Sequence, residues 1–296
     1  MPLYIEPHAG PAPIIQVIRS AHREVSAGVY YLADCPVLKA LKAAKARGVN
    51  VRIIIEGKPY GMKPWQVRKE EKAIEATGAA LHLAPYRFTS HGNSYAFLHS
   101  KYLCNGHECE IGTANFDWSA LGHKNREYLY VTQNPSVVQA ANAVFNADWH
   151  NQRAPAYAHR VLVLSPGTSA AQLIAVINQP GPVSIESEEL GPYAPTLDAI
   201  AAKGRLARLL LPASINAEDK RDVAFLESRG VQVRLLPVKP IYYHGKICVG
   251  GREAFLGSEN LSQTSLEANR EMGLILGGAD IGVLQTQFDK DWEAAR

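Results

Sequence analysis

Apolar and polar residues follow one another in blocks along this chain, and in the first half these blocks predict alternating helices and strands. Three segments carry an apolar face at helical spacing, and three shorter segments are rich in apolar and β-branched residues, as buried strands are. A glycine closes two of the helical segments, which is a common way for a helix to end. The predicted helices are 14–23, 37–47 and 66–76, and the predicted strands are 27–32, 49–55 and 79–83.

The second half of the chain repeats this order with a different sequence. Its predicted helices are 169–177, 194–202 and 218–228, and its predicted strands are 183–187, 206–211 and 231–236. Alternating strands and helices indicate an α/β fold, so we expect two similar α/β sandwich lobes, each a mixed sheet flanked by helices. Residues 151–158, with Pro155 and no periodicity, are the candidate linker. The expected lobes are therefore residues 1–153 and residues 154–296, related by a pseudo-two-fold axis.

Polar residues recur at matched positions in the two halves. The first copy consists of His99-Ser100-Lys101, Gly112-Thr113-Ala114-Asn115 and Asn125-Arg126-Glu127, and the second of His244-Gly245-Lys246, Gly257-Ser258-Glu259-Asn260 and Asn269-Arg270-Glu271. In both copies, the asparagine of the glycine-led segment lies 16 positions after the histidine. Because equivalent residues near a pseudo-two-fold axis face one another, we expect one composite site at the interface of the lobes. Two independent sites are the alternative.

These residue types suit the chemistry of phosphate esters. Residues two apart on a strand share a face, so on the predicted strand 95–103 the side chains of His99 and Lys101 point the same way. Lysine and asparagine side chains can hold an anion whose charge grows in the transition state. One histidine can attack phosphorus while the other protonates the leaving oxygen. The pattern therefore predicts phosphodiester chemistry, the alternative being histidines that only pack in the core.

Carboxyl and hydroxyl groups of the repeat have expected roles as well. A carboxylate bonded to one imidazole nitrogen fixes the histidine tautomer and leaves the other nitrogen facing the substrate, and Glu127 and Glu271 suit this role. The alternative for both glutamates is a solvent-exposed strand position. The hydroxyl groups of Thr113 and Ser258 are candidate donors to the substrate, and a turn-forming role is an equally good interpretation of these two residues.

The repeated residues resemble the phospholipase D superfamily, whose signature is His-x-Lys, a later Asp, and Gly-Ser/Thr-x-Asn. The first copy looks most like the bacterial cardiolipin synthase and small phospholipase D-like branch. The resemblance implies cleavage of a phosphodiester, without a metal or cofactor, through a covalent phosphohistidine. It implies that one lobe supplies the nucleophile and the other the general acid, and we expect His99 to be the nucleophile. The resemblance assigns these roles: His99 and His244 as the catalytic pair, Lys101, Lys246, Asn115 and Asn260 as phosphate ligands, and Glu127 and Glu271 as the orienting carboxylates.

The chain departs from that signature at one position. The motif Asp is missing from both copies, where Asn105-Gly106 and Gly250-Gly251 occupy the region. This leaves open any role of the Asp in supporting the motif or the opposing histidine. The nucleophile, the acid and the phosphate ligands all remain, so we expect an active enzyme, with a catalytically degenerate phosphate-binding protein as the alternative.

The substrate is expected to be recognised by loops outside the repeated motifs. The segment 57–69 mixes basic residues with aromatic ones, and its candidate contacts are Lys58, Tyr60 and Trp65. The segment 85–94 adds Tyr86 and His91 as a candidate wall of the cleft. Such a mixture can follow a nucleic-acid backbone and stack on bases, or lie at a lipid interface. We favour cleavage or transfer of a phospholipid headgroup, with a nuclease for single-stranded nucleic acid as the alternative.

Composition narrows the class of protein only a little. The formal net charge of +3 is too weakly basic to identify a nucleic-acid binder. The chain has no apolar run long enough to span a bilayer, so we expect peripheral contact with a membrane at most. Its N-terminal segment lacks the features of a signal peptide, so we expect a bacterial-type cytoplasmic protein, or a secreted or periplasmic one if a leader was removed. We expect a monomer.

The chain has four cysteines, and two of them are close enough in the sequence to form a disulfide across a turn. Cys104 and Cys109 flank Asn105-Gly106, a dipeptide typical of hairpin turns. Across such a turn the two sulfur atoms can meet as a disulfide, or the two residues can be unpaired strand cysteines. A zinc site with His107 lacks a second pair of Cys or His ligands.

Overall fold

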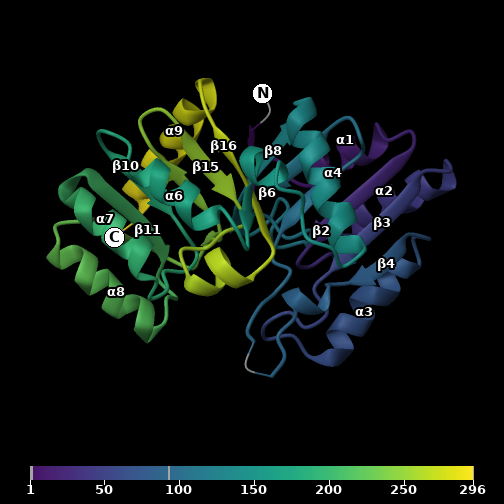
Figure 1. Ribbon diagram of the computed structural model, residues 1–296, viewed down its shortest axis with the longest axis horizontal. Helices are drawn as coiled ribbons and strands as arrows, with labels where there is room; N and C mark the ends of the chain where they lie inside the picture. Colours follow the sequence, from purple (N-terminus) through teal and green to yellow (C-terminus); the bar gives the residue numbers. More distant parts are fainter. Residues whose placement is uncertain (1–2, 93, 296) are drawn as a thin grey trace.

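The computed structural model describes residues 3–92 and 94–295 and contains two α/β lobes side by side (Figure 1). The first lobe runs β1 (Leu3–Ile5), α1 (Ala12–Arg19), β2 (Glu24–Val29), α2 (Cys35–Ala46), β3 (Asn50–Ile55), α3 (Pro64–Glu75), β4 (Ala80–Leu83), the 3₁₀ turn η1 (Tyr86–Phe88), β5 (Lys101–Cys104), β6 (Cys109–Gly112), β7 (Asn125–Arg126), β8 (Tyr128–Thr132) and α4 (Pro135–Trp149). The predicted mixed sheets flanked by helices are confirmed in both lobes.

The second lobe begins after the connection that follows α4. It runs α5 (Ala158–Val161), β9 (Val163–Ser165), α6 (Ser169–Ile177), β10 (Val183–Glu186), α7 (Ala194–Lys203), the 3₁₀ turn η2 (Gly204–Leu206), β11 (Ala207–Pro212), α8 (Ala217–Ser228), β12 (Gln232–Leu236), β13 (Tyr242–Tyr243), β14 (Ile247–Val249), β15 (Ala254–Gly257), the π-helical turn η3 (Thr264–Ala268), β16 (Glu271–Leu276) and α9 (Ala279–Ala294). The expected boundary between residues 153 and 154 lies in the connection between α4 and α5 and stays a prediction.

The two sheets share one topology. The first has the strand order β1-β8-β6-β5-β2-β3-β4 and the second β12-β11-β10-β14-β15-β16-β9, which is the same order of equivalent strands listed from the other edge. In each sheet, the three strands that alternate with helices pair in parallel, and the remaining strands pair antiparallel. The repeat seen in the sequence is therefore a repeat of the whole lobe.

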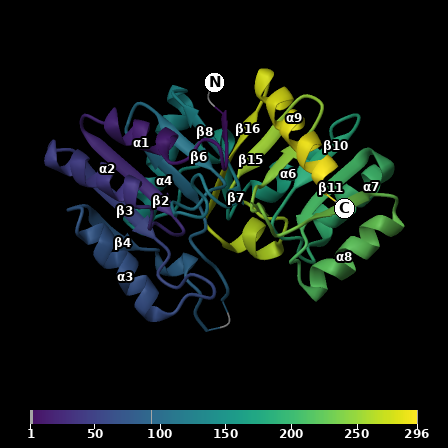
Figure 2. The ribbon, with the colours of Figure 1, turned by 180° about the vertical axis from the view of Figure 1, so that it is seen from behind.

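Helices cover both faces of each sheet. Apolar residues of α1 and α2 pack with β2 and β3 in one core, and those of α6 and α7 pack with β10 and β11 in the equivalent core. The opposite faces are covered by α4 and α9, and α9 lies in the foreground when the molecule is seen from behind (Figure 2). A third apolar cluster joins β5, β6 and β8 to β14, β15 and β16, so the lobes share a buried core. No helix in the described part of the chain is long and apolar enough to cross a membrane.

The prediction of a strand over residues 95–103 is wrong for the residues before Lys101. The strand β5 begins only at Lys101, because the residues before it bond to the other lobe instead of to a neighbouring strand. The backbone N–H of His99 donates to the carbonyl of Arg270 at 2.9 Å, and the N–H of Arg270 donates to the carbonyl of Phe97 at 2.8 Å. In the same way β13, just before His244, pairs in parallel with β7 of the first lobe. Both histidine segments therefore join the two lobes.

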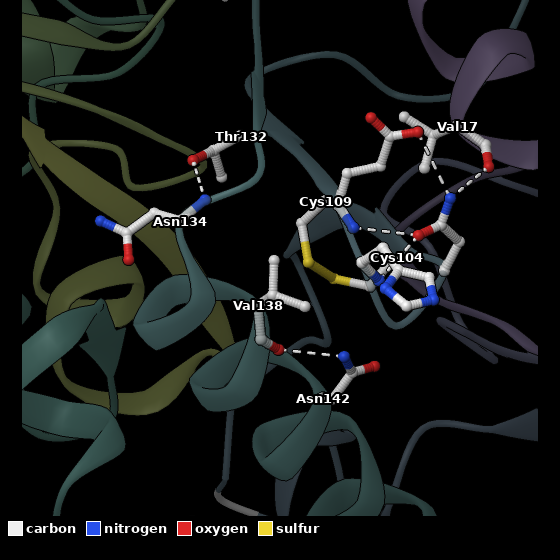
Figure 3. Close-up of a disulfide and its surroundings, with 10 residues drawn as sticks. Val17, Cys104, Cys109, Thr132, Asn134, Val138 and Asn142 are labelled. Atoms are coloured by element: carbon white, nitrogen blue, oxygen red, sulfur yellow. Dashed lines mark hydrogen bonds between the residues drawn. A yellow bond between two sulfur atoms is a disulfide. The ribbon is translucent and has the colours of Figure 1, made fainter. Parts of the chain in front are cut away.

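A disulfide closes the hairpin between β5 and β6 (Figure 3). Cys104 and Cys109 are joined with their Cα atoms 4.1 Å apart, so the disulfide interpretation holds. Asn105 anchors the same turn, because its amide group donates to the carbonyl of Val17 at 2.9 Å while its side-chain oxygen accepts from the N–H groups of His107 and Glu108. The turn is thus closed covalently by the disulfide and fixed to α1 by a hydrogen bond.

Two buried ion pairs connect the lobes symmetrically. The guanidinium of Arg126 in β7 bonds both oxygens of Asp291 in α9 at 2.9 and 3.0 Å. The guanidinium of Arg270 bonds both oxygens of Asp148 in α4 at 2.8 and 3.1 Å. Each pair takes its arginine from one lobe and its aspartate from the other, and the two aspartates stand at matching positions near the ends of α4 and α9.

Candidate active site

The two histidines of the repeat lie at the junction of the lobes, and each is bonded to a glutamate of the opposite lobe. Nδ1 of His99 lies 3.0 Å from both carboxylate oxygens of Glu271. Nδ1 of His244 lies 2.9 Å from Oε2 of Glu127. The structure therefore brings the two halves of the repeat together in one site. The pairing is crossed, because each histidine bonds to the glutamate of the other lobe.

Both glutamates are held in place by neutral side chains. Glu127 accepts hydrogen bonds from the hydroxyl of Thr113 at 2.6 Å and from the amide of Asn125 at 3.0 Å. Glu271 accepts from the amide of Asn269 at 3.0 Å and from the hydroxyl of Ser265 at 2.7 Å. The asparagine of each Asn-Arg-Glu segment thus positions the glutamate two residues later. No pattern in the sequence pointed to Ser265, because it belongs to the π-helical turn and has no counterpart in the repeat.

The hydroxyl groups of Thr113 and Ser258 point into the protein. Both residues are fully buried. Thr113 donates to Glu127 and accepts from the N–H of Tyr128, and Ser258 accepts from the N–H of Met272 at 3.0 Å. The two hydroxyls therefore hold the residues around the histidines in place and do not face the cleft.

The two lysines are buried beside their histidines. Nζ of Lys101 donates to the carbonyl of His99, and Nζ of Lys246 donates to the carbonyl of His244 at 2.5 Å. Burial lowers the pKa of Lys101 to about 7, against the opposing effect of Glu271. A buried ammonium group is costly unless it is paired, so an anion bound between the lysines would be strongly stabilised.

Asn115 and Asn260 complete this group. The side-chain oxygen of each is buried and has no hydrogen-bond partner among the residues that the structure describes. Unpaired buried polar atoms are rare and call for an explanation. The two asparagines stand at matched positions of the repeat, and their amide nitrogens are the atoms that could donate to a phosphate oxygen. We call the six residues His99, Lys101, Asn115, His244, Lys246 and Asn260 the phosphate pocket.

The environment of the two histidines differs. Burial lowers the pKa of His99 below its usual value, although the carboxylate of Glu271 acts in the opposite direction. Burial would raise the pKa of Glu271, but His99 and Lys101 outweigh it and the pKa is lowered, so this carboxylate is ionised at neutral pH. His99 is therefore a neutral imidazole with its proton on Nδ1 and the lone pair of Nε2 free.

His244 faces a second carboxylate that the sequence analysis missed. Oε2 of Glu188 lies 3.1 Å from Nε2 of His244 and 3.0 Å from Nζ of Lys246. Burial would raise the pKa of Glu188, but His244 and Lys246 outweigh it and lower the pKa. Each ring nitrogen of His244 therefore lies within hydrogen-bond distance of a carboxylate oxygen. The sequence contains a signal for this residue, since Glu188 follows the end of a central parallel strand, where ligands commonly bind in α/β folds.

A cavity of about 560 Å³ opens beside His99. Its first-lobe wall is aromatic and consists of Tyr30, Tyr60, Tyr95 and Phe97. Its second-lobe wall is polar and acidic, and the charged residues there are Glu189, Glu218 and Asp219. No lysine or arginine lines it among the described residues. The cavity is therefore suited to a group that is cationic or polar, and unsuited to an extended polyanion.

A second cavity of about 520 Å³ shares Tyr60, Tyr95 and Phe97 with the first. Its lining also includes Lys58, Met62 and Arg68. Lys58 and Tyr60 thus line a cavity that shares a wall with the cavity beside His99. The rim is aromatic, because the side chains of Tyr60 and Tyr95 are more than half exposed.

The other predicted loop residues lie elsewhere. Trp65 lines a separate cavity of about 310 Å³ together with Tyr31 and Leu38. The rings of Tyr86 and His91 stack on each other with centroids 3.7 Å apart. None of these three predicted residues lines the cavity beside His99. The structure therefore does not bring Trp65, Tyr86 and His91 to the phosphate pocket.

The missing motif Asp falls far from the histidines. Its region in each lobe is the turn after β5 or β14, roughly one strand length away from the phosphate pocket. In the first lobe Asn105 caps this turn. In the second, the side-chain oxygen of Gln179 accepts from the N–H groups of Arg252 and Glu253 at 2.8 and 3.1 Å. Orientation of each histidine depends on a glutamate instead. The described residues contain no group of three or more His, Cys, Asp or Glu placed to hold a metal ion.

Comparison with known proteins places this geometry in context. The family described as cardiolipin synthase, PLD-like domain, matches residues 14–149 and 192–292. Phosphatidylserine synthase from Haemophilus influenzae is similar over 99% of this chain and 86% of its own, with a TM-score of 0.69 and 11% identity. Yeast tyrosyl-DNA phosphodiesterase is similar over 86% of this chain and 82% of its own, with a TM-score of 0.52 and 10% identity.

Polyphosphate kinase from Porphyromonas gingivalis is similar over 95% of this chain, with a TM-score of 0.68 and 14% identity. The matched region is 48% of the kinase, so this chain spans about half the length of that protein. At these identities the likenesses to solved structures show a shared fold. No curated protein matches the chain.

Proposed function

Because the chain belongs to the phospholipase D superfamily, we propose that it cleaves or transfers a phospholipid phosphodiester through a covalent phosphohistidine. The observation that carries this proposal is the crossed pairing of His99 with Glu271 and of His244 with Glu127. The crossed pairs place two oriented histidines around two buried lysines. This arrangement provides a nucleophile, an acid and a positively charged pocket between them.

In the first step, the lone pair of His99 Nε2 attacks phosphorus. A P–N bond forms and the bond from phosphorus to the leaving alcohol oxygen breaks. The proton on Nε2 of His244 transfers to that oxygen, so the headgroup leaves as a neutral hydroxyl. Lys101, Lys246, Asn115 and Asn260 hold the nonbridging oxygens and stabilise the charge that develops on them.

The second step reverses these roles. Nε2 of His244, now without its proton, accepts one from water or from an acceptor alcohol. The oxygen of that molecule attacks phosphorus and the P–N bond to His99 breaks. Both histidines return to their starting states, and the product is a phosphatidic acid or an exchanged phospholipid.

Support for a phospholipid over a nucleic acid comes from the cavity beside His99. Four aromatic residues face three carboxylates there, with no basic residue among the described lining. Aromatic faces and carboxylates attract a cationic headgroup, whereas a polynucleotide would be repelled by the same wall. The exposed rings of Tyr60 and Tyr95, beside Lys58 and Arg68, suit contact with a lipid surface.

A side-by-side assay tests the proposal. The protein is incubated with phosphatidylcholine vesicles, phosphatidylglycerol vesicles and single-stranded DNA, with His99→Asn as the control for contaminating activity. We expect headgroup release to be fastest from phosphatidylcholine. In the double variant Glu189→Gln/Glu218→Gln, the ratio of the rate on phosphatidylcholine to the rate on phosphatidylglycerol should fall about tenfold. The reason is that each carboxylate removed weakens the attraction to the cationic headgroup.

Two other results would overturn the assignment. Faster cleavage of DNA, with a steep loss of activity at higher salt, would identify a nuclease. Binding of phosphate without turnover of any of the three substrates would identify a catalytically inactive phosphate-binding protein.

A further inference from the structure

The carboxylate of Glu188 occupies part of the phosphate pocket. It lies 3.0 Å from Nζ of Lys246 and 3.1 Å from Nε2 of His244. The hydroxyl of Tyr242 donates to its other oxygen at 3.1 Å. Lys246 and His244 are groups that the proposed function assigns to a phosphate oxygen and to the leaving oxygen, so Glu188 already uses the donors that a substrate needs.

In the described part of the first lobe, no carboxylate forms such a pair with Lys101 or with Nε2 of His99. The bridges Leu32–Phe116 and Leu190–Leu261 align the two lobes, because each pairs a leucine with the residue after the asparagine of the phosphate pocket. Two residues before these leucines stand Tyr30 and Glu188. The Tyr30 ring lies edge-on to His99 at 4.9 Å, and Nζ of Lys101 lies 5.2 Å from its centroid. An aromatic ring and a carboxylate thus occupy equivalent positions on the two sides of the pocket.

We propose that Glu188 is a positioning residue that occupies, in the free protein, the position of a substrate phosphate oxygen and leaves it when substrate binds. This inference rests on the proposed function of the phosphate pocket. Carboxylate and phosphate oxygens accept the same hydrogen bonds from an ammonium and an imidazolium. Two anions on the same donors would repel each other at close range, so the phosphate displaces the carboxylate.

The exchange of the Glu188 carboxylate for a phosphate gives Lys246 and His244 a hydrogen-bond acceptor both in the free protein and in the substrate complex. In the free protein, Glu188 pairs the buried ammonium of Lys246, which would be costly to leave unpaired. It also lies at hydrogen-bond distance from Nε2 of His244, the atom that the proposed first step uses as the proton donor. In the complex, the phosphate and the leaving oxygen take over these two hydrogen bonds. Simple anions therefore bind weakly, because each must first displace a bound carboxylate.

The experiment measures binding of inorganic phosphate to the whole protein by titration calorimetry at pH 7. We compare the wild type with Glu188→Gln, Glu188→Ala and Glu188→Asp. Glu293→Gln, which removes one exposed carboxylate from α9, is the control for net charge. We expect Glu188→Gln and Glu188→Ala to bind phosphate at least tenfold more tightly than the wild type. Glu188→Asp keeps the charge and should stay within threefold of the wild type, as should the control. Thermal unfolding of each variant verifies that it is folded.

A crystal structure of the wild type with bound vanadate, a phosphate analogue, distinguishes displacement from simple repulsion. We expect a vanadate oxygen on Nζ of Lys246 and the Glu188 carboxylate out of hydrogen-bond distance of that atom. Unchanged or weaker phosphate binding in Glu188→Gln and Glu188→Ala, or a carboxylate that stays on Lys246 beside vanadate, would overturn the inference. Binding is measured without turnover, so a gain in affinity with no activity on any substrate would contradict the proposed function alone.

Discussion

His99 and His244 occupy equivalent positions in the repeat, yet they differ in the charge that surrounds them. His99 has one carboxylate partner, while His244 lies between Glu127 and Glu188. The repeat in the sequence pointed to both histidines and both glutamates, but it did not indicate that each histidine pairs with the glutamate of the other lobe. It did not show the asymmetry, because Glu188 stands where the first lobe has Tyr30 and a repeat reveals only what its two copies share.

A substrate with a good leaving group separates the roles of the two histidines. On phosphatidylcholine, His99→Asn and His244→Asn should each lower the rate by several orders of magnitude, since both act as one unit. On phosphatidyl-p-nitrophenol the leaving oxygen needs no proton. His244→Asn should then release one equivalent of p-nitrophenol in a rapid burst, and His99→Asn should release none. Stopped-flow absorbance measures both, and the opposite pattern would make His244 the nucleophile.

At the scale of elements, hydrophobic periodicity predicted most helices closely, but it predicted a strand wrongly in a segment where the two lobes meet. The helix Ser169–Ile177 has the predicted bounds, and α2, α3, α7 and α8 begin and end within two residues of theirs. The segment before Lys101 was predicted as strand because it is apolar. Its hydrogen bonds go to Arg270 of the other lobe, and no local pattern encodes a partner more than 170 residues away. The roles of Arg126 and Arg270 were missed for the same reason.

Removing one half of an inter-lobe ion pair tests the importance of this junction. Arg126→Met leaves the Asp291 carboxylate buried without its main partner, which we expect to cost about 3–5 kcal/mol of the free energy of unfolding in urea. The double variant Arg126→Met/Asp291→Leu should recover much of this loss, since no buried charge then remains unpaired. Arg221→Met, which removes an exposed pair with Glu218, is the control and should cost less than about 0.5 kcal/mol. A loss no larger than that of the control would contradict a structural role for the pair.

Across the whole molecule, buried carboxyl groups should make the fold less stable as the pH rises. Burial raises the pKa of Glu6 and Glu56 to about 7 and that of Glu70 and Glu186 to about 8. A carboxyl whose pKa is raised in the folded state stabilises the fold below its unfolded pKa and loses that contribution as pH rises through the folded value. Stability should therefore fall between pH 5.5 and pH 8.

Three bases oppose this trend, since the pKa values of His99, His159 and Lys101 are lowered. The carboxyls with raised pKa values are more numerous, because they also include Glu110, Glu189 and Glu259. The lowered pKa values of Glu188 and Glu271 act only below about pH 4, outside this window. Differential scanning calorimetry should give a higher Tm at pH 5.5 than at pH 8. In Glu70→Gln, which keeps the acceptor for the N–H of Leu32, the dependence should be flatter. A Tm that rises with pH in the wild type would refute this account.

The crossed histidine–glutamate pairs also tie activity to the docking of the lobes. Each imidazole is oriented by a carboxylate from across the interface, so a single opening motion between the lobes would misalign both histidines at once. The protein would then lose the proposed nucleophile and the proposed acid together, and no partly open state would retain half of the proposed chemistry. A molecule wedged between α4 and the second lobe, touching neither histidine, would act as an all-or-none inhibitor.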